Sequence, residues 1–187
     1  MKLLIKFSVI PVFLLILLIA GCSQQENSPV DLMNSKSIDQ TTNSDGFSLG
    51  KYSDLPQATL LELQQAKIAT ARYHNINNAI ADGYEDINVI VPHMGYHYLN
   101  AGYLDGTFEA DKPELLVYSP NPGNGNMRLV AVEYAVPVSL SQDPPEGFTG
   151  SYDTWDFNAE FQLWTLHAWV WYYNPDGIFT DLNPRVP

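Results

Sequence analysis

The sequence has one cysteine and few basic residues, and both shortages limit what the protein can be. Cys22 has no partner within the chain, so an intramolecular disulfide is excluded. Only 9 Lys and Arg residues accompany 21 Asp and Glu residues, giving a formal net charge of −12. Such an acidic chain repels phosphate backbones and anionic lipid headgroups, so nucleic acid is not expected among its partners.

Familiar catalytic motifs are also missing. We recognise no zincin helix motif, no nucleophile elbow and no glycine-rich phosphate loop. The sequence therefore assigns no reaction, and it leaves open whether the protein is an enzyme.

Long apolar runs are absent except at the N-terminus. Lys2 and Lys6 precede an apolar run over residues 9–20, a pattern typical of an export signal. This run is shorter than the ~20 residues needed to span a bilayer. The end, Ile19-Ala20-Gly21-Cys22, resembles the lipobox of bacterial lipoproteins. We therefore expect a signal peptide over residues 1–21 and lipidation of Cys22 as the first mature residue.

Lipidation implies a location. The mature chain would be held to a membrane by the lipid on Cys22, on the extracytoplasmic side of the cell envelope, because acyl chains give durable anchoring. Removing Lys2 and Lys6 leaves 7 basic against 21 acidic residues, a formal charge of −14. Residues 22–51 are polar and poor in large apolar side chains, which predicts a flexible tether. Residues 52–187 are long enough for a single domain.

The stretch from residue 57 to 82 predicts one long helix. Residues 59–62 fit a capping box, no proline interrupts the stretch, and Gly83 suits a left-handed helix end. His74 falls on the polar face, where we expect a solvated side chain. Residues at helical spacing predict one buried stripe: Leu61, Ala69, Tyr73, Ile76 and Ile80.

After the helix the pattern changes to short runs rich in β-branched and aromatic residues. A turn-forming segment at 121–126 predicts a hairpin between two of these runs. Consecutive strands with short connections favour an antiparallel sheet. The predicted fold class is therefore α+β, with one long N-terminal helix packed on an antiparallel, curled β-sheet or partial barrel. The expected strands are residues 87–91, 96–99, 115–118, 127–136 and 163–173.

Several blocks of this region together resemble an uncharacterised family of exported bacterial proteins. The blocks are Met94-Gly95-Tyr96-His97-Tyr98, Val132-Glu133-Tyr134, Leu166-His167-Ala168-Trp169, Asn174-Pro175 with Gly177 and Phe179, and Asn183-Pro184-Arg185-Val186. The resemblance covers most of residues 65–187. That family has no established activity, so the resemblance implies candidate positions at His97, Glu133 and His167 and no reaction.

The spacing of His93 and His97 allows two geometries. On a helix their β-carbons would lie about 6 Å apart and could share a metal ion, but Pro92 and Gly95 disfavour a helix here. On a strand, four residues span about 13 Å, so joint binding would require the chain to turn at Met94-Gly95.

Glu133 interrupts an apolar run, and strand alternation places it on the face of Leu129, Ala131 and Ala135. An ionised carboxylate facing a core costs several kcal/mol unless it is paired or coordinated. A structural ion pair with Arg185 or an edge position facing water would also explain it. The groups that could neutralise the charge of Glu133 are Arg185, Lys112, His97, His167 or a metal ion.

His167 lies among tryptophans, where a strand would place it on the face of Thr165, Trp169 and Trp171. Considered without the other two residues, His167 is interpreted as a histidine of the core. Two imidazoles and one carboxylate, however, form a known ligand set for zinc and for non-haem iron, and imidazole also suits copper.

Three hypotheses follow. The first is a metal-binding lipoprotein that uses His97, Glu133 and His167, with His93 as a further candidate. The second is a binding module for a small organic ligand or an envelope protein, with an aromatic cleft built from Tyr96, Tyr98, Trp169 and Trp171. The third is a polar cluster with a purely structural role.

Overall fold

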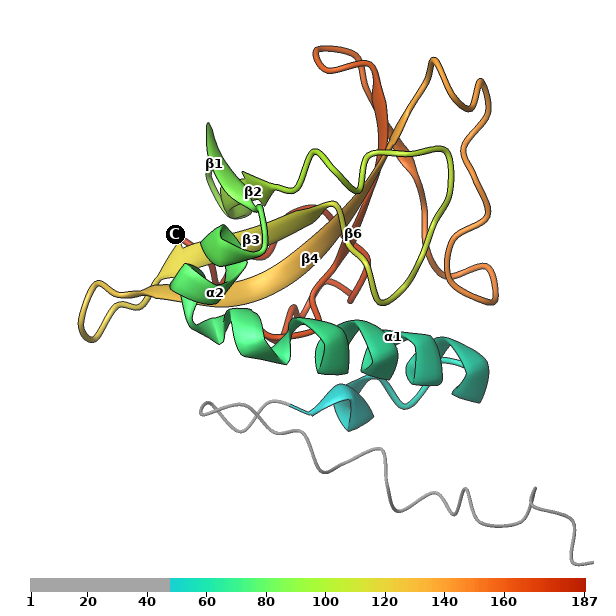
Figure 1. Ribbon diagram of the computed structural model, residues 1–187. Helices are drawn as coiled ribbons and strands as arrows, with labels where there is room; N and C mark the ends of the chain where they lie inside the picture. Colours follow the sequence, from blue (N-terminus) through green and yellow to red (C-terminus); the bar gives the residue numbers. More distant parts are fainter. Residues whose placement is uncertain (1–47) are drawn as a thin grey trace, which may run out of the picture. The chain divides into compact units, whose positions relative to one another are not determined.

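The computed structural model describes residues 48–187 (Figure 1). The predicted signal peptide, Cys22 and residues 22–47 of the predicted tether lie outside the described residues. The described chain begins with a 3-10 helix, η1 (Leu49–Tyr52), whose Leu49 and Tyr52 side chains are buried. Within residues 48–187, no helix has both the length and the apolar character that crossing a membrane requires.

Three helical segments follow where one was predicted: α1 (Gln57–Thr70), the 3-10 helix η2 (Ala71–His74) and α2 (Ile76–Ala81). The prediction of one long N-terminal helix, and the fold class that depends on it, is therefore wrong. The break falls at Asn75, whose side chain accepts a hydrogen bond from Asn77 N at 3.1 Å. An asparagine side chain that caps a new helix competes with the helical hydrogen bonds of the old one. The carbonyl of Tyr73, which Asn77 N would otherwise bind, accepts the Tyr118 hydroxyl at 2.7 Å.

The buried face of α1 also differs from the predicted stripe. Leu61 is 38% exposed, and Ile80, in α2, is 54% exposed. The predicted capping box is wrong too, because Thr59 and Glu62 bind a distant loop. Thr59 donates to the Thr149 carbonyl, and the Glu62 carboxylate accepts from the backbone and hydroxyl of Thr149 at 2.6 Å each. The residues of α1 that are buried are Thr59, Leu60, Leu63, Ala66, Lys67 and Thr70.

Six strands form one curled antiparallel sheet, which has the form of a half-barrel (Figure 1). Their order is β1-β2-β3-β4-β6-β5. The predicted hairpin between β3 and β4 is confirmed. The short strand β5 was not predicted, and β6 ends before the predicted residue 173. The strands are β1 (Glu85–Val91), β2 (Gly95–Leu99), β3 (Leu115–Pro120), β4 (Met127–Pro137), β5 (Asp156–Asn158) and β6 (Leu163–Ala168).

The two faces of the sheet have different neighbours. Residues directly opposite one another on paired strands share a face. One face carries the row Tyr98, Leu116 and Val132, and it packs against the helical layer through contacts such as that of Tyr118 with Tyr73. The other face is concave, and it carries the candidate residues.

Candidate metal centre

Strand register brings His97, Glu133 and His167 onto the concave face. Glu133 on β4 lies directly opposite His167 on β6 and opposite Leu115 on β3. His97 on β2 lies opposite Val117, two residues along β3 from Leu115 on the same face. Strands β2 and β4 are separated by one intervening strand, β3. Adjacent strands in a sheet are about 4.8 Å apart. The curl of the sheet turns these side chains toward one another.

A β-bulge modifies the predicted alternation in β4. The register shifts between the pairs Val117 with Ala131 and Tyr118 with Leu129, so β4 has one extra residue there. Leu129 consequently lies on the helix-facing side with Tyr118, and the prediction that it shares a face with Glu133 is wrong. The shift does not affect Ala131, which keeps the face of Glu133.

The three side chains are buried and close together. His97, Glu133 and His167 are 3%, 7% and 1% exposed. His97 Nε2 lies 3.5 Å from one carboxylate oxygen of Glu133, and His167 Nδ1 lies 3.7 Å from the other. One ligand atom from each residue can be chosen so that all three lie within 4.8 Å of one another. These three residues therefore lie close enough to bind one metal ion.

The backbone fixes which nitrogen of His97 is free to bind. His97 Nδ1 lies 3.1 Å from the carbonyl oxygen of Val89. A carbonyl only accepts hydrogen bonds, so Nδ1 carries the proton and the lone pair of the neutral ring is on Nε2. Nε2 is the atom that faces Glu133. A histidine held by a backbone carbonyl in this way is oriented as metal-binding histidines usually are.

His167 is held by stacking and has an unpaired atom. Its ring stacks on Trp169, with centroids 5.7 Å apart and an interplanar angle of 27°. Its Nε2 is buried and has no hydrogen-bond partner among the described residues. A buried polar atom in that state costs roughly 1–3 kcal/mol. The nitrogen of His167 that faces Glu133 is the other one, Nδ1.

Burial shifts the pKa values of all three residues toward their neutral forms. It raises the pKa of Glu133 to about 8, with smaller contributions from the charges of Asp181 and Glu114. It lowers the pKa of His167 to about 3, with a smaller contribution from His97. It also lowers the pKa of His97, although the hydrogen bond to Val89 opposes the shift. Without a cation, the site therefore favours neutral side chains, and no Lys or Arg is paired with Glu133 among the described residues.

The three residues line a cavity of about 410 Å³ on the concave face. Its other walls are mainly apolar. The aliphatic residues that line it come from β1, β2, β3 and β6: Ile87, Val89, Val91, Leu99, Leu115 and Leu163. A mostly apolar cavity with a few convergent polar groups is the usual form of a small-molecule site.

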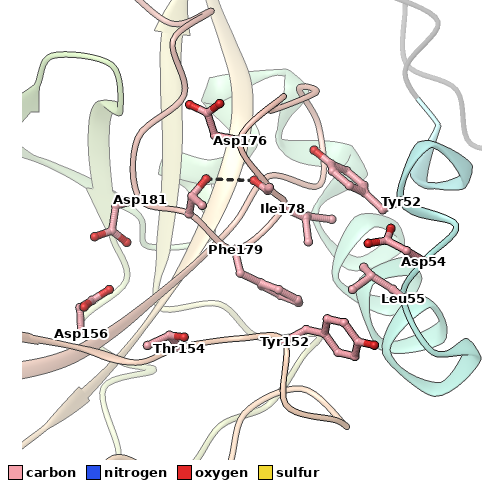
Figure 2. Close-up of a pocket in the computed structure, with 12 residues that line it drawn as sticks. Tyr52, Asp54, Leu55, Tyr152, Thr154, Asp156, Asp176, Ile178, Phe179 and Asp181 are labelled. Carbon is pink, nitrogen blue, oxygen red and sulfur yellow. Dashed lines mark hydrogen bonds between the residues drawn. The ribbon is translucent and has the colours of Figure 1, made fainter.

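Two aspartates that the sequence did not reveal line the same cavity. They are Asp156 on β5 and Asp181 in the C-terminal segment. Burial raises the pKa of Asp181, and the charge and hydrogen bond of Asp156 raise it further. Figure 2 shows both residues at one end of a neighbouring pocket of about 450 Å³, which they also line. Neither lies in a long periodic strand, so no pattern in the sequence marked them.

The remaining predicted residues lie elsewhere. His93 is in the turn between β1 and β2, with Nδ1 2.9 Å from the Val186 carbonyl oxygen, and it is not part of the three-residue group. The alternative partners of Glu133 are also occupied by other contacts. Arg185 lies over the rings of Tyr172 and Tyr173, and Lys112 pairs with Glu109.

The aromatic residues form clusters, but not the predicted cleft. Trp169 and Trp171 are buried, at 0% and 2% exposure, and Trp171 donates to Thr70 in the helical layer. Tyr98 packs edge-on against Tyr118 in the core on the face away from the cavity.

The expectation that the sequence has no nucleophile-elbow pattern is wrong as to spacing. Residues 46–50 read Gly-Phe-Ser-Leu-Gly, which has the spacing of a nucleophile elbow. Ser48, however, precedes a 3-10 helix, and its hydroxyl oxygen accepts a hydrogen bond from Gly50 N at 3.1 Å. Ser48 therefore caps this 3-10 helix.

Comparison of the chain with protein-family models, with curated proteins and with solved structures finds no significant match. The functional assignment therefore depends on the geometry of the site.

Proposed function

We propose that this protein is a lipid-anchored protein of the bacterial cell envelope whose extracytoplasmic domain binds one divalent transition-metal ion through His97, Glu133 and His167. One observation carries the metal proposal: three buried side chains of ligating type, from three different strands, lie with their ligand atoms within 4.8 Å of one another.

The ligand set narrows the choice of metal. Two imidazoles and one carboxylate suit zinc or non-haem iron, and copper is the third candidate. Three protein ligands leave at least one coordination position open. Because the same residues line the cavity, that open position would face the cavity and could accept an external molecule.

The anchor is supported by the sequence of the N-terminus. Lys2, Lys6, the apolar run at 9–20 and Cys22 match a lipoprotein signal. The test is to express the full chain and the Cys22→Ala variant in a bacterium fed a clickable palmitate analogue. We expect labelling and membrane fractionation for the wild type and neither for the variant. An unlabelled wild-type protein recovered without membranes would contradict the anchor.

The metal proposal is tested with the untagged domain. Elemental analysis should find about one metal ion per chain after equilibration with zinc, ferrous iron or cupric ion and removal of the excess. At a free metal concentration 100 times Kd, binding should stabilise the fold by about 2.7 kcal/mol. His97→Ala should lose the metal, whereas His93→Ala, which alters a neighbouring imidazole outside the group, should keep it.

A structural role for the cluster predicts different results. The wild-type domain would then contain no metal, and added metal would leave its unfolding unchanged. Replacing His97, Glu133 and His167 together by Leu, Met and Phe would leave stability equal or higher, because a buried polar cluster can be replaced by packed apolar groups. Metal-free wild-type protein together with that result would refute the metal proposal.

A further inference from the structure

The cavity beside the three ligating residues has two distinct parts, and their chemistry constrains what can enter. At the base lie the two histidines and Glu133, all at most 7% exposed. The walls are aliphatic side chains from four strands of the half-barrel. An occupant must therefore present one donor atom to the base and an apolar body to the walls.

The mouth of the cavity adds an aromatic side chain. Phe161 in the β5–β6 turn lines the cavity and is 49% exposed. Phe157 on β5 pairs with Trp164, and its ring packs against that of Trp164 on the other face of the sheet, with centroids 5.4 Å apart. Large aromatic surface left in water is unfavourable, and where it rims a pocket it marks a place where another apolar surface binds. An apolar occupant would cover part of the Phe161 ring.

The charges around the cavity select against ionised occupants. Asp156 and Asp181 line it and add negative charge, so an anion is repelled on entry. A cationic donor such as an ammonium group has no lone pair left to give a metal ion at the base. A molecule without net charge meets neither penalty.

From these observations we infer that the cavity binds a small, neutral, largely apolar molecule that places a single nitrogen, oxygen or sulfur donor on the open position of the metal. This inference rests on the proposed metal site and adds its ligand class. The volume of about 410 Å³ lies within the range of about 300–1,000 Å³ that is usual for small-molecule pockets.

The test uses domain loaded with Co²⁺, whose visible absorption reports its coordination. Three probes are titrated at pH 8: imidazole, which has the donor alone; 4-phenylimidazole, which adds an apolar ring; and benzoate, which has the ring and a negative charge. We expect 4-phenylimidazole to bind at least about tenfold more tightly than imidazole, because its ring is buried against the walls, and more tightly than benzoate.

Two variants locate the binding. Thr165 is partly buried on β6 and lines the cavity, so Thr165→Phe should fill it, keep the Co²⁺ spectrum and remove the advantage of 4-phenylimidazole. Gln65→Phe adds the same ring to the exposed side of α1, and it should leave the advantage unchanged. The comparison of the three probes on the wild-type domain stands even if Thr165→Phe fails to fold.

The outcomes separate the two proposals. Co²⁺ binding with equal affinities for imidazole and 4-phenylimidazole, or with preference for benzoate, overturns the ligand class and leaves the metal site standing. Failure of the wild-type domain to bind Co²⁺, zinc, iron or copper overturns both. Retention of the tenfold advantage in a folded Thr165→Phe domain also overturns the inference, because the phenyl ring would then lie outside this cavity.

Discussion

Replacing Glu114 by glutamine should remove a pH dependence from the folding stability of the domain. Glu114 is 2% exposed directly before β3, and its Oε2 accepts a hydrogen bond from Ala135 N at 3.0 Å. Burial raises its pKa from 4.5 to about 8, and hydrogen bonds from the backbone oppose only part of that shift. The folded protein therefore keeps a proton on Glu114 that the unfolded chain releases.

The direction and size of the pH effect on stability follow from the difference between the folded and unfolded pKa values of Glu114. The stability that protonated Glu114 contributes is fully present below pH 4.5 and is lost as the pH rises to about 8. One pKa unit corresponds to about 1.4 kcal/mol, so the free energy of unfolding should fall by roughly 2.5 kcal/mol between pH 5 and pH 7 from this residue. Glutamine has no charge at either pH, and its amide oxygen can still accept from Ala135 N.

The assay is urea unfolding followed by tryptophan fluorescence, with a chelator present, at pH 5, 6 and 7. The free energy of unfolding of Glu114→Gln, minus that of the wild type, should rise by roughly 2.5 kcal/mol from pH 5 to pH 7. The m-value should be unchanged. Glu133 is present in both proteins, so its titration cancels in the difference to first order. Glu85→Gln, at an exposed position in β1, is the control and should show no such gain. Parallel pH profiles for wild type and Glu114→Gln would refute the reasoning.

Three further predictions test individual contacts. Gly95→Ala should destabilise the domain by several kcal/mol in urea unfolding, because Gly95 has a φ of +126° and an added Cβ would press against the Tyr118 carbonyl oxygen; an unchanged midpoint would contradict this close approach. Asn75→Ala removes the cap of α2 and should cost about 1 kcal/mol by the same measurement, whereas equal stability would show that the cap contributes nothing. In isothermal titration with zinc, His93→Ala should bind like the wild type, whereas His97→Ala should lose at least about tenfold in affinity; equal losses would place His93 in the site.

The candidate site could be predicted because its signal is local. A carboxylate or imidazole within an apolar strand costs free energy wherever the strand lies, so Glu133 and His167 stood out without knowledge of their neighbours. What makes them meet is not local. The direct pairing of Glu133 with His167, and the curl that brings in His97, depend on strand order and register across the whole sheet.

In the helical layer, by contrast, the local pattern gave a wrong prediction. A helical pattern over residues 57–82 predicted one helix, but Asn75 uses its side chain as a cap, and Tyr118 from a strand binds the carbonyl freed at Tyr73. That second contact is made by a residue far along the chain, so periodicity within the segment could not reveal it. The same reason applies to Asp181, which approaches the site only through the fold of the C-terminal segment.

The two faces of the sheet are packed differently, which explains how a small domain can keep an open cavity beside a buried polar cluster. The helix-facing side supplies the packed core, in which Tyr118, Tyr134 and Leu116 are fully buried. On the concave side, the neighbours of Glu133 on its own strand are Ala131 and Ala135, whose side chains are too small to fill the hollow. Val117, on the concave side, is also fully buried in the core. Substitutions at the partly exposed positions that line the cavity, such as Ile87 and Leu163, should therefore alter ligand binding more than folding.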